Sequence, residues 1–175
     1  LARRAARGYV AGPELADALR VCDELARRGL AVTLCPWSEA GATPAQVAMA
    51  YRDAIAAMRA GEHDWYLSVK APELGFVTER VTETASAASA AGVRVHFDAH
   101  GPETADRTFA LIAAARGHNP CVGCTLPGRW RRSVEDAERI AAEVAAVRVV
   151  KGQWKDPDAP RRDPAEGFLQ VVDRL

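Results

Sequence analysis

The sequence predicts an α/β fold with a parallel sheet, made of about five βα units of a TIM-type (β/α)8 barrel. Short apolar segments alternate five times with segments of helical periodicity along the 175 residues, which is typical of parallel sheets. A charged residue stands at or just after the end of each apolar segment, as at the mouth of a barrel: Glu39, Lys70, Asp98, Arg129 and Lys151. Because no linker-like stretch divides the chain, we expect residues 1–175 to form a single, partial barrel domain.

Helices are predicted where apolar residues recur at helical spacing and a capping residue stands in front of them. Leu15 and Leu19 belong to the first such stripe, and Thr43, followed by a proline, is a preferred N-cap for the second helix. Ser133, with Asp136 three residues later, predicts the N-cap of the fifth helix. In chain order the predicted helices cover 13–28, 43–60, 78–91, 104–116, 133–146 and 167–175.

Strands are predicted for the five apolar segments, of which the last is the clearest. Three of the four residues from Val147 to Val150 are valine, a β-branched residue that favours extended backbone. Because this strand is apolar along its length, we expect it to be buried on both faces. Side chains alternate along a strand, so Arg148 and Val150 should share one face and Val149 and Lys151 the other. In chain order the predicted strands cover 30–35, 65–70, 93–98, 121–126 and 147–151.

Two architectures fit this alternation, a doubly wound sheet and a barrel. A doubly wound sheet that binds a dinucleotide should carry a glycine-rich turn after its first strand. The first exit, Cys35-Pro36-Trp37-Ser38-Glu39, contains no glycine, so we favour the barrel. A complete barrel needs about 250 residues, so five units would leave open edges on the first and fifth strands. Open edges favour pairing between copies, and we therefore expect homo-oligomers or aggregates of the isolated chain.

Charge and cysteine content restrict the class of protein. Lys and Arg number 23, as do Asp and Glu, and this balance favours neither a nucleic-acid nor a membrane-surface partner. No run approaches the ~18–20 apolar residues of a transmembrane helix. Cys22, Cys35, Cys121 and Cys124 do not form a disulfide framework for a chain of this size. We expect a cytoplasmic protein, either free or peripheral at the membrane.

Several charged residues lie in or at the ends of predicted buried strands: Lys70, Asp98, Arg148 and Lys151. Charges in such places are costly unless they are paired or used. They form either a structural ring of ion pairs around the barrel mouth or a polar pocket for an anionic or polar ligand. The pair Arg131-Arg132 precedes a predicted helix start, where it would either contact a phosphate or be solvated.

Two motifs have the spacing of metal ligands. His96, Asp98 and His100 alternate along one strand and could hold a metal ion, but no second cluster of ligands is evident. Cys121 and Cys124 have zinc or redox spacing, yet they form a single such pair, and we favour a core cysteine for Cys124. We therefore predict no metal site.

Taken in order, the motifs resemble the proline dehydrogenase family of flavin-dependent (β/α)8 barrels. The resemblance covers residues 12–175 and the front five units of that barrel. It rests on four stretches: Ser68-Val69-Lys70, Val95-His96-Phe97-Asp98, Arg131-Arg132-Ser133 with Asp136, and Val147-Arg148-Val149-Val150-Lys151-Gly152.

The resemblance implies roles for five residues. Lys70 corresponds to the lysine that meets the substrate carboxylate, and Asp98 to the acidic residue beside the active site and the flavin. Arg148, through its side chain, and Val150, through its backbone, correspond to the positions that reach the N5–O4 edge of FAD. Lys151 corresponds to the adjacent lysine at the flavin.

The fourth strand departs from the family pattern. In the family it ends in leucine-glutamine-alanine-tyrosine, and the glutamine binds the flavin ring. Here the stretch reads Leu126-Pro127-Gly128-Arg129, which lacks that amide. We therefore expect weaker FAD retention than in a typical member of the family, or a substitute contact from Arg129.

The resemblance implies FAD-dependent oxidation of L-proline, or of a close analogue, to the cyclic imine 1-pyrroline-5-carboxylate. The electrons would pass to an acceptor such as a quinone. Two alternatives remain open: a non-catalytic or truncated barrel remnant, and a barrel enzyme such as an aldolase that uses Lys70 or Lys151 as a Schiff base.

Overall fold

The computed structural model describes residues 10–58 and 65–175, which form one five-stranded sheet flanked by helices. The strands are β1 (Val32–Leu34), β2 (Trp65–Val69), β3 (Arg94–Phe97), β4 (Val122–Pro127) and β5 (Ala146–Val150). The helices are α2 (Leu15–Arg27), α3 (Pro44–Met58), α4 (Thr78–Ala90), α5 (Ala105–Arg116), α6 (Ser133–Ile140) and α7 (Pro164–Val172), with a short 3-10 helix η1 (Pro102–Thr104).

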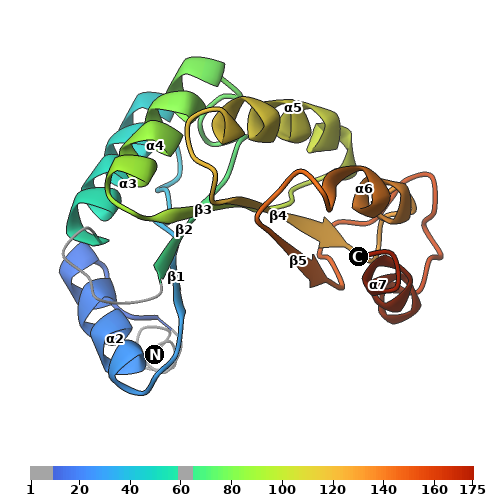
Figure 1. Cartoon of the computed structure of the whole chain (residues 1–175), viewed down its shortest axis with the longest axis horizontal. Helices are drawn as coiled ribbons and strands as arrows, with labels where there is room; N and C mark the ends of the chain where they lie inside the picture. Colours follow the sequence, from blue (N-terminus) through green and yellow to red (C-terminus); the bar gives the residue numbers. More distant parts are fainter. Residues whose placement is uncertain (1–9, 59–64) are drawn as a thin grey trace.

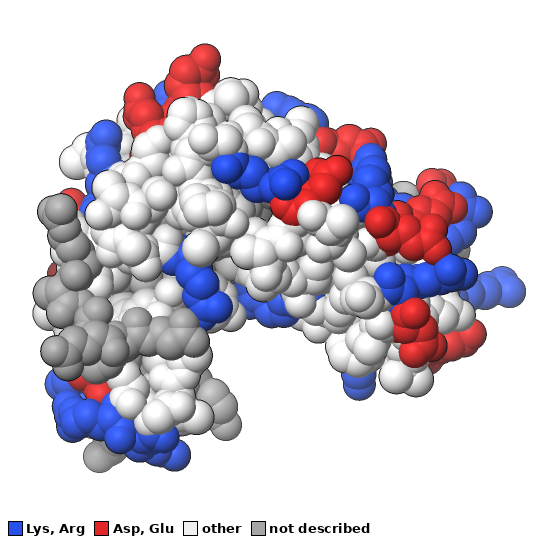
Figure 2. Space-filling model, in the orientation of Figure 1, with Lys and Arg blue, Asp and Glu red and all other residues white. Residues whose placement is uncertain are grey.

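The sheet is parallel throughout, and its spatial order β1-β2-β3-β4-β5 follows the chain. It curls into an open half-barrel whose convex outer side carries α3, α4 and α5 (Figure 1). The space-filling view shows the molecule hollowed between the two ends of the arc, with basic side chains reaching the hollow (Figure 2). This confirms the predicted α/β half-barrel of about five βα units.

Alternation along the strands sorts side chains between the two sides of the sheet. Leu67, Val69, Phe97 and Leu126 are buried in the core beneath the outer helices. Burial of side chains of this size contributes roughly 1.5–3 kcal/mol each. The intervening strand residues therefore face the concave side, where the polar ones among them have to find partners.

Strand β5 differs from its predicted environment. It was expected to be buried on both faces, but Ala146 is exposed and Val147 to Val150 are only half-buried. The prediction was wrong because β5 pairs with β4 alone and is an edge of the described sheet. Strand β1, at the opposite edge, has the same position with β2 as its neighbour.

Side-chain capping sets some of the helix starts, whereas α4, α5 and α6 begin without a side-chain cap. Helix α3 begins after Thr43, whose hydroxyl accepts from the backbone N–H of Gln46 at 3.3 Å, as predicted. Helix α7 begins earlier than expected because Asp163 is its N-cap. The prediction that Ser133 is an N-cap was wrong, because Arg132 occupies that position. Asp136 instead accepts hydrogen bonds from arginine side chains.

Helix α6 is also shorter than the predicted helix, which extended to residue 146. It ends at Ile140, and turns lead into β5, with the N–H of Ala145 donating to the carbonyl of Val122 at 2.8 Å. The chain has to leave the helix early because β5 must already be in register with β4 at Ala146. Within the two described ranges, no helix has the length and apolar character needed to cross a membrane.

Candidate functional site

Five polar residues of strands β2 to β5 and the end of β3 form a connected group on the concave side. We call Ser68, His96, Asp98, Thr125 and Arg148 the arginine cluster. Pairing of the strands places Ser68 opposite His96 and Thr125 opposite Arg148. Because these positions share one face of a curled sheet, side chains from four strands converge on the guanidinium group.

Arg148 is the centre of this cluster. Its Nη2 donates to Oδ1 of Asp98 at 2.9 Å, and its Nε donates to Nε2 of His96 at 3.3 Å. The hydroxyl of Ser68 donates to the second carboxylate oxygen of Asp98 at 2.5 Å. The carboxylate is thus fixed from β2 while it holds the arginine that comes from β5.

The guanidinium group still has donors to offer a ligand. These two contacts use two of its five N–H groups. The Arg148 side chain is 35% exposed, so the remaining donors are within reach of the concave side. A fixed, partly exposed cation of this kind suits an anion or the electron-rich edge of an aromatic ligand.

His96 lies beneath the guanidinium group and is only 5% exposed. Burial, and then the charge of Arg148, lower the pKa of His96 to about 4, so the ring is neutral at neutral pH. Its Nε2 also lies 3.0 Å from the hydroxyl of Thr125. The spacing of His96, Asp98 and His100 is compatible with metal ligands, although no metal site was predicted. The contact with Arg148 was missed because it joins residues 52 positions apart.

A second group of polar residues surrounds Lys70, at the end of β2. We call Trp37, Ser38, Lys70 and Glu73 the lysine cluster. Nζ of Lys70 lies 3.5 Å from Oε1 of Glu73 and 4.7 Å from the centre of the Trp37 ring. Ser38 donates from its hydroxyl to the other oxygen of Glu73 at 2.5 Å. The ammonium group therefore lies between a carboxylate and an indole that come from two loops.

The backbone beneath Lys70 is anchored by a residue of helix α3. The hydroxyl of Tyr51 accepts from the N–H of Lys70 at 3.0 Å, and Tyr51 is completely buried. Desolvation by burial raises the pKa of Tyr51, so the hydroxyl stays neutral. Glu39, the charged residue after β1, lies in an exposed loop closed by a hydrogen bond from Ala42 N to its carbonyl.

The ends of β4 and β5 are closed by backbone contacts. Gly128 N donates to the carbonyl of Val150 at 2.7 Å, and Arg129 N donates to the carbonyl of Lys151 at 3.0 Å. A Cβ on Gly128 would collide with the backbone of Phe168 in α7. The departure from the family pattern at this position thus accompanies a close approach of α7, while the side chain of Lys151 is exposed.

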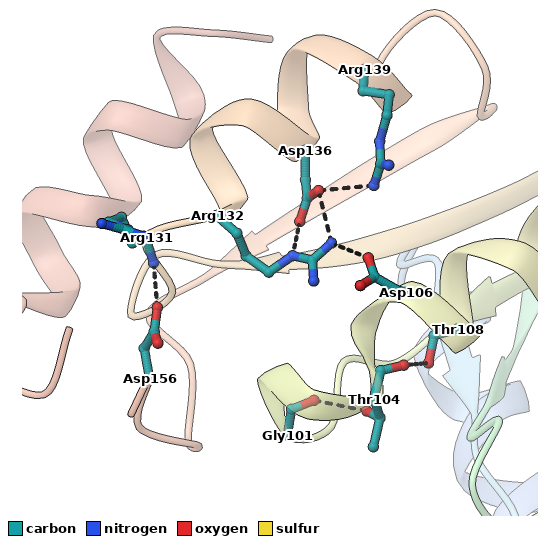
Figure 3. A network of polar contacts seen from close by, with 9 residues as sticks. All are labelled: Gly101, Thr104, Asp106, Thr108, Arg131, Arg132, Asp136, Arg139 and Asp156. Atoms are coloured by element: carbon teal, nitrogen blue, oxygen red, sulfur yellow. Dashed lines mark hydrogen bonds and ion pairs between the residues drawn. The ribbon is translucent and has the colours of Figure 1, made fainter. Parts of the chain in front are cut away.

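The Arg131-Arg132 pair takes part in a network of polar contacts around the start of α6 (Figure 3). Arg132 donates to Asp136 at 2.8 Å and to Asp106 of α5 at 2.5 Å, and the hydrogen bond from Arg132 lowers the pKa of Asp106. Arg139 donates to Asp136 at 2.9 Å. These contacts join α5 to α6 and already supply carboxylate partners to Arg132.

Neither sequence motif with metal-ligand spacing forms a metal site in the described part of the chain. Among residues 10–58 and 65–175, no three His, Cys, Asp or Glu side chains are grouped so as to hold a metal ion. Cys124 is a buried free thiol whose pKa is raised by burial, whereas Cys121 is exposed. A core position for Cys124 is therefore confirmed.

The half-barrel is similar to part of solved proline utilization A (PutA) structures. PutA from Bdellovibrio bacteriovorus, inactivated by N-propargylglycine, aligns with a TM-score of 0.73 and 16% identity over 84% of this chain and 20% of that chain. A mutant of Bradyrhizobium japonicum PutA aligns with a TM-score of 0.56 and 21% identity over 69% of this chain and 16% of that chain. PutA with proline bound in remote sites aligns with a TM-score of 0.57 and 21% identity over 69% of this chain and 15% of that chain.

These alignments use about a fifth or less of each PutA chain. No protein-family model and no curated protein matches the sequence. At this level of identity the likeness shows the fold. The chain has a proline dehydrogenase-like barrel fold, as the order of its motifs predicted.

Proposed function

We propose that the protein oxidises L-proline, or a close analogue, to 1-pyrroline-5-carboxylate with FAD as cofactor. The observation that carries the proposal is the fixed pair of Arg148 and Asp98 on the concave side, 2.9 Å apart at their closest atoms. These are the residues that the sequence resemblance assigns to the flavin. The similarity of the fold to PutA supports the same assignment.

The residues on the concave side fit a flavin in one respect and depart in another. Arg148 offers a fixed cation with unused donors, which suits the N5–O4 edge, and FAD, when bound, supplies the acceptor for the hydride from the substrate. The backbone of Val150 and the side chain of Lys151 would complete this edge. Pro127 has no amide for the pyrimidine edge, and Nε of Arg129 is already bonded to the carbonyl of Gly152, so we expect weak FAD retention.

Lys70 would bind the carboxylate of the substrate. Nζ of Lys70 lies beside the carboxylate of Glu73 and over the ring of Trp37. A substrate carboxylate would either join Glu73 at this position or displace it. A small cyclic amino acid would then lie between the lysine cluster and the arginine cluster. An acceptor such as a quinone, a cytoplasmic location and self-association through the open sheet edges are parts of the same proposal.

The Schiff-base alternative has less support. Schiff-base formation uses the neutral amine, whereas Lys70 lies beside Glu73 in the geometry of an ion pair, and Lys151 is exposed. Borohydride treatment in the presence of a carbonyl substrate would trap a covalent adduct on lysine if that chemistry occurred. A non-catalytic remnant would bind no FAD and reduce no dye.

The test uses the protein at its natural length. We expect it to take up FAD and to reduce an artificial electron-accepting dye when L-proline is added. D-proline and an acyclic amino acid such as L-leucine serve as controls. FAD binding without any dye reduction by L-proline or its close analogues would contradict the proposed function.

A further inference from the structure

We propose that His96 is a positioning residue that holds the guanidinium group of Arg148 in place by accepting a hydrogen bond as a neutral imidazole. Only the catalytic part of its test rests on the proposed function, because the contact exists whatever reaction the site performs. His96 itself faces the guanidinium group from below and needs no contact with substrate or cofactor.

The geometry fixes the tautomer. Arginine can only donate hydrogen bonds, and its Nε lies 3.3 Å from Nε2 of His96. Nε2 must therefore be the unprotonated nitrogen of the ring, and the single proton of the neutral ring is on Nδ1. Thr125 lies 3.0 Å from the same nitrogen through its hydroxyl, which is free to rotate and donate to it. Nε2 has one lone pair, so the donors of Arg148 on β5 and Thr125 on β4 share it as a bifurcated acceptor.

The sheet makes room for this ring at one glycine. A Cβ on Gly123 would lie 2.7 Å from Nδ1 of His96 and 2.7 Å from the carbonyl oxygen of Ala146. Gly123 is the β4 residue paired with His96, so the missing side chain allows the imidazole to lie flat against β4. On the opposite side the ring of Tyr66 is 5.6 Å away, centre to centre. The ring is confined between β2 and β4, in reach of Arg148.

The charges around the ring favour its neutral form. Burial of the ring opposes protonation most strongly; Arg148 on β5 and Arg94 on β3 oppose it as well, whereas Asp98 favours it. The ring of Tyr66 on β2 and the hydroxyl of Thr125 on β4 also face it. Protonation would remove the acceptor at Nε2 and place a second cation against Arg148, so the guanidinium group would lose one of its two supports.

The direct test is nitrogen NMR of the protein at its natural length, labelled with ring-15N histidine. The resonance that disappears in His96→Gln identifies His96. We expect Nε2 to be unprotonated at pH 7, and Arg148→Met to raise the pKa of His96 because a facing cation is lost. The exposed His118, which contacts Ser86 at 3.0 Å, serves as a control that should not move. An Nε2–H tautomer, or a His96 pKa unchanged in Arg148→Met, would overturn the proposal.

The second test of the positioning role measures kinetics with L-proline for two substitutions of His96. His96→Gln keeps a carbonyl acceptor that never protonates, whereas His96→Leu has none. We expect kcat to fall about 10-fold in His96→Leu, the loss typical of a hydrogen bond to a charged group, with KM unchanged and most of the loss restored in His96→Gln. Equal losses in the two variants, or a change in KM alone, would contradict a positioning role. If L-proline is not a substrate at all, the NMR result still decides the contact.

Discussion

The two cations on the concave side are held in different ways. Arg148 of the arginine cluster donates hydrogen bonds to His96, which lies in β3, and to Asp98, which directly follows that strand. His96 is 5% exposed. Lys70 of the lysine cluster is flanked by Glu73 and by Trp37, which belong to loops, and Trp37 is 88% exposed.

The difference indicates separate tasks. A side chain held by neighbouring strands keeps its geometry while a ligand binds and leaves, so Arg148 is suited to a fixed electrostatic role. Loop contacts rearrange more easily, so Lys70 is suited to exchange Glu73 for another carboxylate. We therefore propose that the arginine cluster controls the rate of the chemical step and that the lysine cluster controls the affinity for substrate.

Loss of the strand-held cation should have the largest effect. We expect Arg148→Ala to lower kcat for L-proline by about 10²–10³-fold with little change in KM, as when one positioned donor is removed. Steady-state dye reduction by the natural-length protein measures both constants. Arg116→Ala, at the C-terminal end of α5, is the matched control and should leave them unchanged. An unaltered kcat in Arg148→Ala would contradict a role of Arg148 in the chemical step.

The buried histidine should make stability depend on pH. The pKa of His96 is lowered to about 4 in the folded state, against about 6.5 when unfolded, so between these values the unfolded chain binds more protons. The free energy of unfolding should therefore fall as pH drops from about 6.5 to about 4, by about 3 kcal/mol in total. Urea denaturation of the wild type and His96→Gln across this range measures the difference. The same pH dependence in both proteins would argue against a buried neutral ring.

A methyl group at Gly123 should damage the arginine cluster from below. Gly123→Ala places a Cβ against both the imidazole of His96 and the backbone of β5, and overpacking of this kind costs about 1–3 kcal/mol. Thermal denaturation measures the loss. Gly117→Ala is the matched control, since its Cβ would meet the nearest atom at 3.4 Å in an ordinary helical conformation. Equal stability of the two variants would show that the ring lies elsewhere.

The lysine cluster should respond in KM rather than in kcat. We expect Lys70→Met to raise KM for L-proline about 10-fold, because the cation for the substrate carboxylate is lost. Trp37→Leu should raise it only about 2–5-fold, since an exposed cation–π contact contributes about 0.5–1 kcal/mol. Initial rates over a range of L-proline concentrations separate the two constants. A fall in kcat without a change in KM would reverse the assignment of tasks.

The outer ion pairs should matter least to the site. We expect Arg132→Gln to cost about 1 kcal/mol of stability, since Asp136 keeps its contact with Arg139. Activity should stay at the wild-type level because the partners of Arg132, Asp106 and Asp136, belong to neither the arginine cluster nor the lysine cluster (Figure 3). Urea denaturation and dye reduction on the same preparations check both statements. A marked loss of activity would mean that these helices control the concave side.

Alternation and strand ends were enough to predict the half-barrel. They left open whether the charged residues at the strand ends form ion pairs or a pocket, and the pairing of Asp98 with Arg148 comes from the structure. The partners of the two cations were not predictable in the same way. The spacing of His96 beside Asp98 gives no sign of the contact with Arg148, which joins residues 52 positions apart. Trp37 contacts Lys70 only because the loop after β1 folds over the end of β2.

The predictions of the burial of β5 and of the start of α6 were wrong for a related reason. The valine content of β5 is that of an interior strand, and only the sheet order shows that it is an edge. Ser133 has the residue type of a cap, but Arg132 takes the N-cap position and Asp136 is drawn to Arg132 and Arg139. In both cases the tertiary arrangement decides between local signals that are equally good on their own.

The most direct test of the central claim is anaerobic titration of the FAD-loaded protein, at its natural length, with L-proline. Bleaching of the flavin absorbance reports the reduction itself, without an external acceptor. We expect L-proline to bleach the flavin of the wild type. In Arg148→Ala we expect slow bleaching even at saturating L-proline, and in Lys70→Met we expect bleaching that needs more L-proline but reaches the wild-type rate. Bound flavin that L-proline does not bleach would contradict the proposed function. A normal rate in Arg148→Ala together with a slow rate at saturating L-proline in Lys70→Met would contradict the division of tasks between the two clusters.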